Sequence, residues 1–468
     1  MESQTTYNYK FIWMICLVAA MGGLLFGYDW VVIGGAKPFY EAYFGLVGKD
    51  KAWLAGWAMS SALAGCLGGA MLSGAITDKL GRKKVLIISA IMFTASAIWT
   101  ALSRDFNSFI IARIIGGAGI GLASNVSPMY IAETSPSEMR GKFVSINQLT
   151  IVIGVLAAQL VNLLIYKYSP LDKGATTEMI LKSWNGQYGW RWMFAAETIP
   201  AALFFFLALI IPESPRWLLK KGKKDEAHGI LTKVGGEEFA NKEIEDISQT
   251  VDGEYRKVNI GEYFKPRIIK IIALGAFLAV FQQWCGINTI FNYAEEIFKA
   301  AGYDVSGMMF NIVITGVVNL LFTFVAIKTV DKWGRRPLML FGSGGLMVIY
   351  GIMGAFYYYK VTGIAVLIVV LAAIACYAMT LAPITWVLLS EIFPNRIRGG
   401  AMSFCVSALW VACFLLTVTF KPINVALGAS GTFWLYGAIC LVGFIVILLQ
   451  VPETKGKSLE DIERELVD

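Results

Sequence analysis

Residues 26–30 read FGYDW and place a carboxylate, Asp29, at the end of an apolar run. The run from Phe11 to Tyr28 has no charged residue, and the next charge after Asp29 is Lys37. An ionisable group within lipid is costly and usually marks an ion or proton path. The alternative is that Asp29 lies in a water-filled funnel and has no role.

Arg113 places an opposite charge inside another apolar stretch. With opposed helices rising 1.5 Å per residue, Asp29 lies roughly 27 Å from the start of its helix and Arg113 roughly 10 Å from the other side. Both charges then fall in the same half of a hydrocarbon core about 30 Å thick and could pair. A carboxylate beside arginine stays ionised, and it takes a proton more readily once the pair opens and water leaves. Proton coupling requires that alternation.

A third set of polar groups lies in one later apolar stretch, which contains Gln282, Gln283 and Asn288, with Asn292 and Tyr293 one turn on. Amides within a membrane either join helices or bind substrate. So many in so short a stretch favour binding.

Other chemistries find no support in the sequence. The seven cysteines fall in apolar stretches, and the single histidine, His228, lies in a charged segment. We therefore expect no disulfide, no metal site and no cofactor. The sequence lacks a P-loop and a nucleophile–base pair within the apolar stretches, so we expect neither ATP-driven transport nor an enzyme.

The composition indicates an integral membrane protein. Hydrophobic residues make up 57% of the 468 residues and charged residues only 16%, with a mean hydropathy of +0.62; soluble domains average about 25% charged. The net charge of +7 fits basic cytoplasmic loops, not nucleic-acid binding. We expect a monomer in the bilayer, with the first apolar run retained as a helix and not cleaved as a signal peptide.

Apolar stretches of about 20 residues predict an all-α membrane protein with twelve transmembrane helices. They lie near 11–35, 53–77, 85–103, 106–132, 143–166, 191–211, 268–298, 306–330, 338–359, 363–392, 401–420 and 432–451. The predicted domains are an N-terminal six-helix bundle (1–211), cytoplasmic linker helices (212–267), a C-terminal six-helix bundle (268–451) and a cytoplasmic tail (452–468).

Basic residues gather in the loops after spans 2, 4, 8 and 10, which predicts that both termini are cytoplasmic. These loops also repeat: DKLGRKK at 78–84 matches DKWGRRP at 331–337, and ETSPSEMRGK at 133–142 matches SEIFPNRIRGG at 390–400. PESPRWL at 212–218 matches PETKGKS at 452–458. Three pairs at similar offsets indicate two parallel six-helix repeats, the plan of major facilitator transporters. The alternative is that the basic loops only fix topology.

Eight segments of the chain carry a family resemblance: GRKK, GRRP, ARIIGGAGIGLAS, SPMYIAE, PESPRWL, FQQWCGIN, WVLLSEIFPNRIRG and VPETKGKSLEDIE. With these segments the chain resembles the sugar porters of the major facilitator superfamily, above all the bacterial D-xylose–proton symporters. The resemblance covers about residues 11–463. It implies a proton-coupling role for Asp29, where symporters carry Asp and proton-independent animal facilitators carry Asn.

The resemblance also implies a set of substrate-binding residues: Phe26, Gln148, Gln282, Gln283, Asn288, Tyr293, Asn319, Trp386 and Trp410. The two tryptophans could instead be packing residues. Breaks near Gly286 and Pro383 would let two helices bend. Three positions depart from the xylose porters: Leu409 replaces a glutamine, Asn292 an aromatic residue and Trp30 a small residue.

The remaining acids and arginines are assigned to loops and to conformational gating: Asp78, Arg82, Glu133, Arg140, Glu197, Arg216, Arg335, Glu391 and Arg398. Together these features predict proton-coupled import of a neutral pentose or hexose, such as D-xylose, across the cytoplasmic (inner) membrane by alternating access. The alternatives are a proton-independent sugar uniporter and, less expected, a sugar sensor that does not transport.

Overall fold

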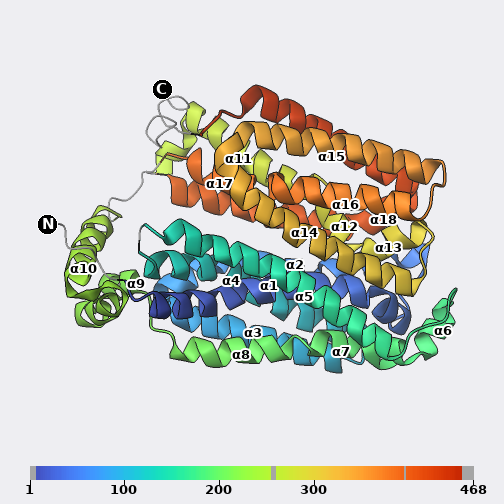
Figure 1. The fold of residues 1–468 in the computed structure, drawn as a ribbon, viewed down its shortest axis with the longest axis horizontal. Coiled ribbons are helices and arrows are strands. Elements are labelled where there is room, and N and C mark those ends of the chain that lie inside the picture. Colours follow the sequence, from blue (N-terminus) through green and yellow to red (C-terminus); the bar gives the residue numbers. More distant parts are fainter. Residues whose placement is uncertain (1–6, 137, 255–259, 395–396, 456–468) are drawn as a thin grey trace. The chain divides into compact units, whose positions relative to one another are not determined.

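The computed structural model describes residues 7–136, 138–254, 260–394 and 397–455, and within these ranges every regular element is a helix (Figure 1). The first helices are α1 (Tyr9–Tyr43), η1 (Lys49–Lys51), α2 (Ala52–Leu80), α3 (Arg82–Leu102), α4 (Phe106–Thr134), α5 (Arg140–Tyr168), α6 (Thr177–Lys182), η2 (Asn185–Gly189), α7 (Trp190–Ala195), α8 (Thr198–Ile210), α9 (Pro215–Lys220) and α10 (Lys224–Glu254). They are followed by η3 (Ile260–Phe264), α11 (Pro266–Trp284), α12 (Ile287–Asn292), α13 (Ala294–Ala300), α14 (Val305–Trp333), α15 (Arg335–Tyr358), α16 (Ile364–Met379), α17 (Leu381–Glu391) and α18 (Arg398–Gln450).

Eleven stretches of the described residues are long and apolar enough to cross a membrane. The last of them, Gly400–Gln450, covers both the eleventh and the twelfth predicted spans. Its helix, α18, turns at Gly428, whose φ of 70° is not helical. The spans are therefore those expected from the sequence, with the final two joined across a kink.

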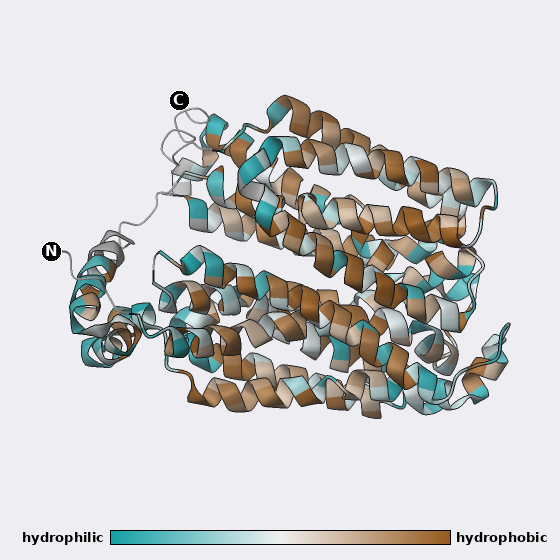
Figure 2. Ribbon diagram, viewed as in Figure 1, coloured by the Kyte–Doolittle hydropathy of each residue, from teal (hydrophilic) through white to brown (hydrophobic). Residues whose placement is uncertain are grey.

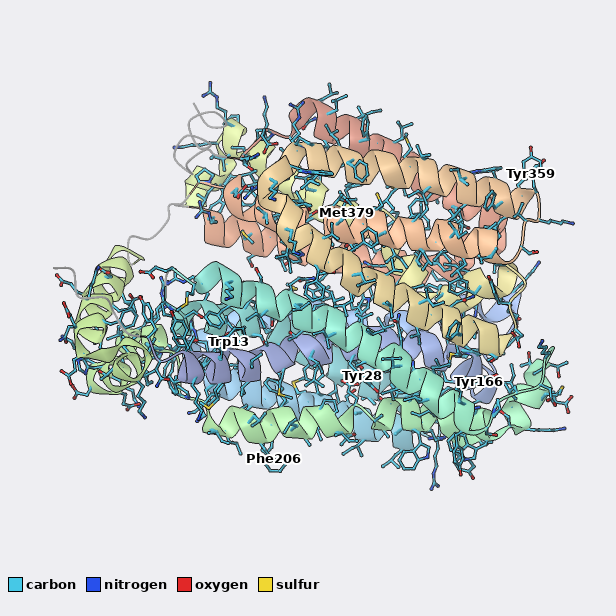
Figure 3. The ribbon with its side chains drawn as sticks, in the orientation of Figure 1. Trp13, Tyr28, Tyr166, Phe206, Tyr359 and Met379 are labelled. Carbon is cyan, nitrogen blue, oxygen red and sulfur yellow. The ribbon has the colours of Figure 1, made fainter. Side chains whose placement is uncertain are left out.

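The long helices consist largely of hydrophobic residues (Figure 2). On α8, Phe206 is 62% exposed and projects away from the neighbouring helices (Figure 3). Such exposure would be costly in water and fits a lipid-facing surface. By contrast α10, within the predicted 212–267 linker, carries many hydrophilic residues (Figure 2).

Contacts divide the chain into two compact units, which do not coincide with the sequence halves. Unit 1 comprises residues 1–29, 64–154 and 194–257; unit 2 comprises 30–63, 155–193 and 258–468. In unit 1, α3 packs against α4 and α8, and α9 packs against α10. In unit 2, α18 packs against α11 and α15, and α16 packs against α14 and α15.

Local signals explain several helix ends. Asp105 caps α4 by accepting a hydrogen bond from the Ser108 amide at 2.9 Å, and Asp304 caps α14 through the Gly307 amide at 3.1 Å. The first helix is longer than predicted, because α1 continues past residue 35 to Tyr43 and includes Pro38. Lys37, predicted to lie in a loop, is consequently inside this helix.

Candidate functional site

The predicted pair between Asp29 and Arg113 is present in unit 1. Arg113 Nη1, on α4, donates to Asp29 Oδ1, on α1, and Arg113 Nη2 donates to the Asp29 carbonyl at 3.3 Å. Each residue is only 2% exposed. The guanidinium carbon also lies 5.3 Å from the centre of the Phe194 ring, a cation–π distance. The pair is thus buried and held from two sides.

Glu197 joins this pair, which corrects its assignment to a loop. It lies within the span Asn185–Ile210, between α7 and α8, and is 2% exposed. Its carboxyl interacts with both Asp29 and Arg113. Among the described residues, Asp29 Oδ2, Glu197 Oε1 and Arg113 Nε are buried without a hydrogen-bond partner. Unit 1 therefore holds two carboxyl groups beside one guanidinium.

The amides of the predicted sugar site form a chain in unit 2. Gln283 Nε2 donates to Gln282 Oε1 at 2.6 Å, and Asn288 Nδ2 donates to Gln283 Oε1. The local reason is a break between α11 and α12 at Gly286, whose φ of 88° requires glycine or a strained residue. The predicted break at Gly286 therefore turns Asn288 back toward Gln283.

A second break lies near the predicted one at Pro383. Thr380 has non-helical angles (φ −128°, ψ −90°) and separates α16 from α17. Pro383 falls in the first turn of α17, where its missing N–H costs no helical hydrogen bond. Trp386 follows on the same helix and is 39% exposed.

Two aromatic residues of the predicted site differ in their surroundings. Trp410, on α18, is 5% exposed, and its ring centroid lies 6.2 Å from that of Trp30. Tyr293 is fully buried, and its hydroxyl donates to the Thr417 carbonyl at 2.7 Å. The Tyr293 hydroxyl is thus used within unit 2 and does not join the amide chain.

The other predicted sugar contacts are spread over both units. Asn319, on α14, is half-buried in unit 2. In unit 1, Gln148 on α5 is exposed and Phe26 on α1 is half-buried.

A charged cluster forms in unit 1 around Arg82 at the start of α3. Arg82 Nε and Nη2 donate to the two oxygens of Glu133, each at 2.8 Å, and Ser214 Oγ donates to Glu133 at 2.5 Å. Glu213 accepts the backbone N–H groups of Arg82 at 2.8 Å and Lys83 at 3.1 Å. Carboxylates are favoured at such a helix N-terminus.

An equivalent cluster forms in unit 2 around Arg335 at the start of α15. Arg335 Nη2 donates to Glu391 at 3.1 Å, and Thr454 Oγ1 donates to Glu391 at 2.6 Å. Glu453 accepts the N–H groups of Arg335 at 3.0 Å and Arg336 at 3.2 Å. Burial raises the pKa of Glu453, but donated backbone N–H groups outweigh it and lower the pKa overall.

The remaining gating candidates are less central. Asp78 lies 3.6 Å from both Arg82 and Lys220, and Arg398 donates to the Phe393 carbonyl at 3.2 and 3.3 Å. Arg140 begins α5 and is exposed, and Arg216 lies in α9. Of the matched loop residues, the Asp331 side chain, Arg396 and residues 456–468 lie outside what the structure describes.

Sequence reasoning missed the role of four residues in these clusters: Glu213, Ser214, Glu453 and Thr454. The matched PES and PET motifs were the available signal. These motifs indicated a repeat. They did not indicate that Glu213 would accept the backbone N–H groups at the start of α3, or that Glu453 would do the same at the start of α15.

The sequence of the chain matches a known protein family. The model of the family described as "Sugar (and other) transporter" matches residues 15–466. The chain belongs to this family. It is a transporter family of membrane proteins, in agreement with the apolar helices.

Individual relatives match over nearly the whole chain. The D-xylose-proton symporter of Escherichia coli K12 is 39% identical, over 98% of this chain and 96% of its own length. The arabinose-proton symporter of Bacillus subtilis is 37% identical over the same shares. The glucose facilitated diffusion protein of Zymomonas mobilis is 33% identical over 96% of each chain. Relatives therefore differ in sugar and in mode of transport.

Solved structures agree with the fold. The xylose transporter of E. coli in a partially occluded inward-open conformation matches with a TM-score of 0.84 and 37% identity. The match covers 96% of this chain and all of that one. The chain is thus a multi-pass sugar porter with the fold of the major facilitator superfamily, as the sequence motifs predicted.

Proposed function

We propose that this protein imports a neutral monosaccharide together with a proton. The observation that carries the proposal is the buried group formed by Asp29, Arg113 and Glu197. Two carboxylates and one guanidinium have a formal charge of −1, which is costly in a buried site. A single proton makes the group neutral. When Asp29 carries that proton, its ion pair with Arg113 can break. Uptake and release of that proton then alternate with closed and open ion pairs.

The sugar site is proposed at the amide chain of Gln282, Gln283 and Asn288. These amides donate to and accept from one another. Sugar hydroxyls both donate and accept, so they can replace these bonds without leaving a buried amide unpaired. Trp386, which is 39% exposed, is proposed to stack on the CH face of a sugar. Gln148, Phe26, Asn319, Tyr293 and Trp410 are proposed as further contacts from the family resemblance.

Alternating access is proposed to move two parallel six-helix bundles, residues 1–211 and 268–451, about this site. The clusters around Arg82 and Arg335 have the same plan: an arginine after a glycine, a paired glutamate, and a second glutamate on the backbone N–H groups. This equivalence supports an internal repeat. The basic loops support cytoplasmic termini in an inner membrane.

Proteoliposome uptake tests the proposal. We expect labelled pentoses or hexoses to accumulate when a pH gradient is imposed, and only to equilibrate without one. A protein that equilibrates sugar at the same rate with and without the gradient would be a uniporter, the mode named for the Zymomonas relative. Absence of uptake together with intact sugar binding would instead favour a sensor.

A further inference from the structure

A second buried charge cluster lies in unit 2 and shares no charged residue with the groups discussed above. It comprises Lys37 and Glu41 of α1, Glu295 and Glu296 of α13, and Lys421 of α18. We call it the Lys37 cluster. Lys37 is 1% exposed, Glu41 6% and Glu295 8%. A buried lysine needs its charge compensated, and carboxylates of α1 and α13 supply that compensation.

Lys37 is the centre of the cluster. Its Nζ donates to Glu295 Oε2 and to Glu296 Oε1, each at 2.8 Å, and lies 3.6 Å from Glu41 Oε1. An ammonium has three N–H donors, so these three carboxylates match its capacity. The same Nζ lies 5.4 Å from the centre of the Tyr293 ring. Lys37 therefore ties the end of α1 to α13 and to the residue preceding it.

Lys421 closes the cluster from the third helix. Its Nζ donates to both oxygens of Glu41, each at 2.9 Å, and lies 3.7 Å from Glu296. Asn424, one turn further on α18, donates to Glu296 at 3.4 Å. The cluster is thus a connected set in which three carboxyl groups face two ammonium groups.

The connected segments are distant in sequence but belong to one compact unit. Residues 30–63 of the first sequence half cluster with 258–468, whereas residues 1–29 cluster with unit 1. Helix α1 therefore changes packing partners at Asp29, and the part beyond it carries Lys37 and Glu41. This end of α1 lies opposite the N-terminus and is predicted to face the outside.

We propose that the Lys37 cluster is an ionic latch that closes the outer end of the sugar path and opens once in each transport cycle. The inference rests on the proposed function, because alternating access requires the two sequence halves to separate at this end. Separation would pull Lys37 and Glu41 away from α13 and α18. Water entering between them would hydrate the freed charges, which lowers the cost of opening. The charged side chains are thereby hydrated when the latch is open and paired with one another when it is closed.

Thiol labelling tests the latch without requiring sugar. The seven native cysteines are buried, and Asn292, on α12 one turn before the latch glutamates, is 4% exposed. An Asn292→Cys reporter would be labelled by a membrane-impermeant maleimide, added outside, only when the outer end opens. In that background we expect Lys37→Met to label at least about tenfold faster than the unaltered latch. Lys37→Arg, which keeps the charge, should label slowly.

Lys182→Met is the matched control, since Lys182 pairs with Glu178 in a fully accessible position, each side chain being 75% exposed. It should leave the labelling rate unchanged. If Lys37→Met does not fold, Lys421→Met tests the latch instead. This substitution keeps Lys37, and the Lys421 side chain is less buried, at 12% exposed. Equal labelling rates in the latch variants and the control would overturn the proposal. If the unaltered protein shows no sugar uptake but the labelling differences are observed, the proposed function is refuted and the latch is still supported.

Discussion

Arg113 donates to Asp29 twice, once to the carboxylate and once to the backbone carbonyl, with both residues almost fully buried. Removing one partner of a buried pair typically costs about 3–5 kcal/mol, because the other charge is left uncompensated. The proton-coupling role should therefore be tested with an isostere at Asp29 that keeps an acceptor for Arg113.

Asp29→Asn should abolish sugar accumulation under a proton gradient while leaving sugar binding and counterflow measurable. The amide keeps an acceptor oxygen but cannot take up a proton in the relevant pH range. Uptake and counterflow in proteoliposomes measure the two activities separately. Asp172→Asn, at an exposed position, is the matched control and should accumulate sugar normally. Continued accumulation by Asp29→Asn would remove this residue from the coupling mechanism.

Gln282→Ala should weaken the binding of every transported sugar by a similar factor. Gln282 contributes to an amide chain that would meet hydroxyls common to many pyranoses. The expected loss is on the order of 1–3 kcal/mol, the cost of a broken buried hydrogen bond. Calorimetry with five sugars measures it, and a loss confined to a single sugar would contradict the shared role.

Leu409→Gln should change the order of preference among sugars, in favour of D-xylose. Leu409 is 3% exposed and precedes Trp410 on α18, so it supplies an apolar group where the xylose porters supply an amide. An added amide can pair with a hydroxyl that the leucine leaves unpaired. Tryptophan quenching across the same five sugars gives the ranking. A uniform change with the order preserved would exclude Leu409 from selectivity.

Glu133→Gln should raise the inward-open population. The Glu133 carboxylate accepts two hydrogen bonds from Arg82 and one from Ser214, and glutamine offers only one acceptor oxygen. A cysteine introduced at the cytoplasmic mouth should then label faster than in the parent protein. Glu138→Gln, at a nearby exposed acid, should not alter labelling. Unchanged labelling with lost activity in Glu133→Gln would point to misfolding instead.

Glu453→Gln should lower thermal stability in a pH-dependent way. The pKa of Glu453 is below its ordinary value in the folded protein because it accepts N–H groups of Arg335 and Arg336. A lowered folded pKa gives stability that is present above the unfolded pKa, about 4.3, and is lost as the pH falls through the folded value. The difference in Tm between the two proteins should thus be full at neutral pH and shrink below about pH 4. A difference independent of pH would show that the carboxylate charge is not responsible.

The membrane-spanning helices could be predicted from the sequence. Whether a segment spans the membrane depends on the hydrophobicity of that continuous segment, so the lengths of the apolar runs predicted the helices. A glycine within one of these runs, Gly286, predicted a break. Opposite charges at a matched depth predicted the Asp29–Arg113 pair, since the rise per residue in a helix is constant. Repeated GR and PE motifs indicated an internal repeat, although not the contacts that their acids make.

Which distant groups meet depends on how separate segments pack. Glu197 reaches Asp29 from the junction of α7 and α8, where Phe194 of α7 lies against Arg113 of α4, and no pattern in its own segment shows this. The Tyr293 hydroxyl is satisfied by the Thr417 carbonyl, a backbone atom over a hundred residues away. Lys37, expected in a loop, becomes a buried charge once α1 extends to Tyr43, and its partners come from α1 itself and from α13. Burial of a charge is settled by packing between segments far apart in the chain, and composition and spacing within one segment do not contain that information.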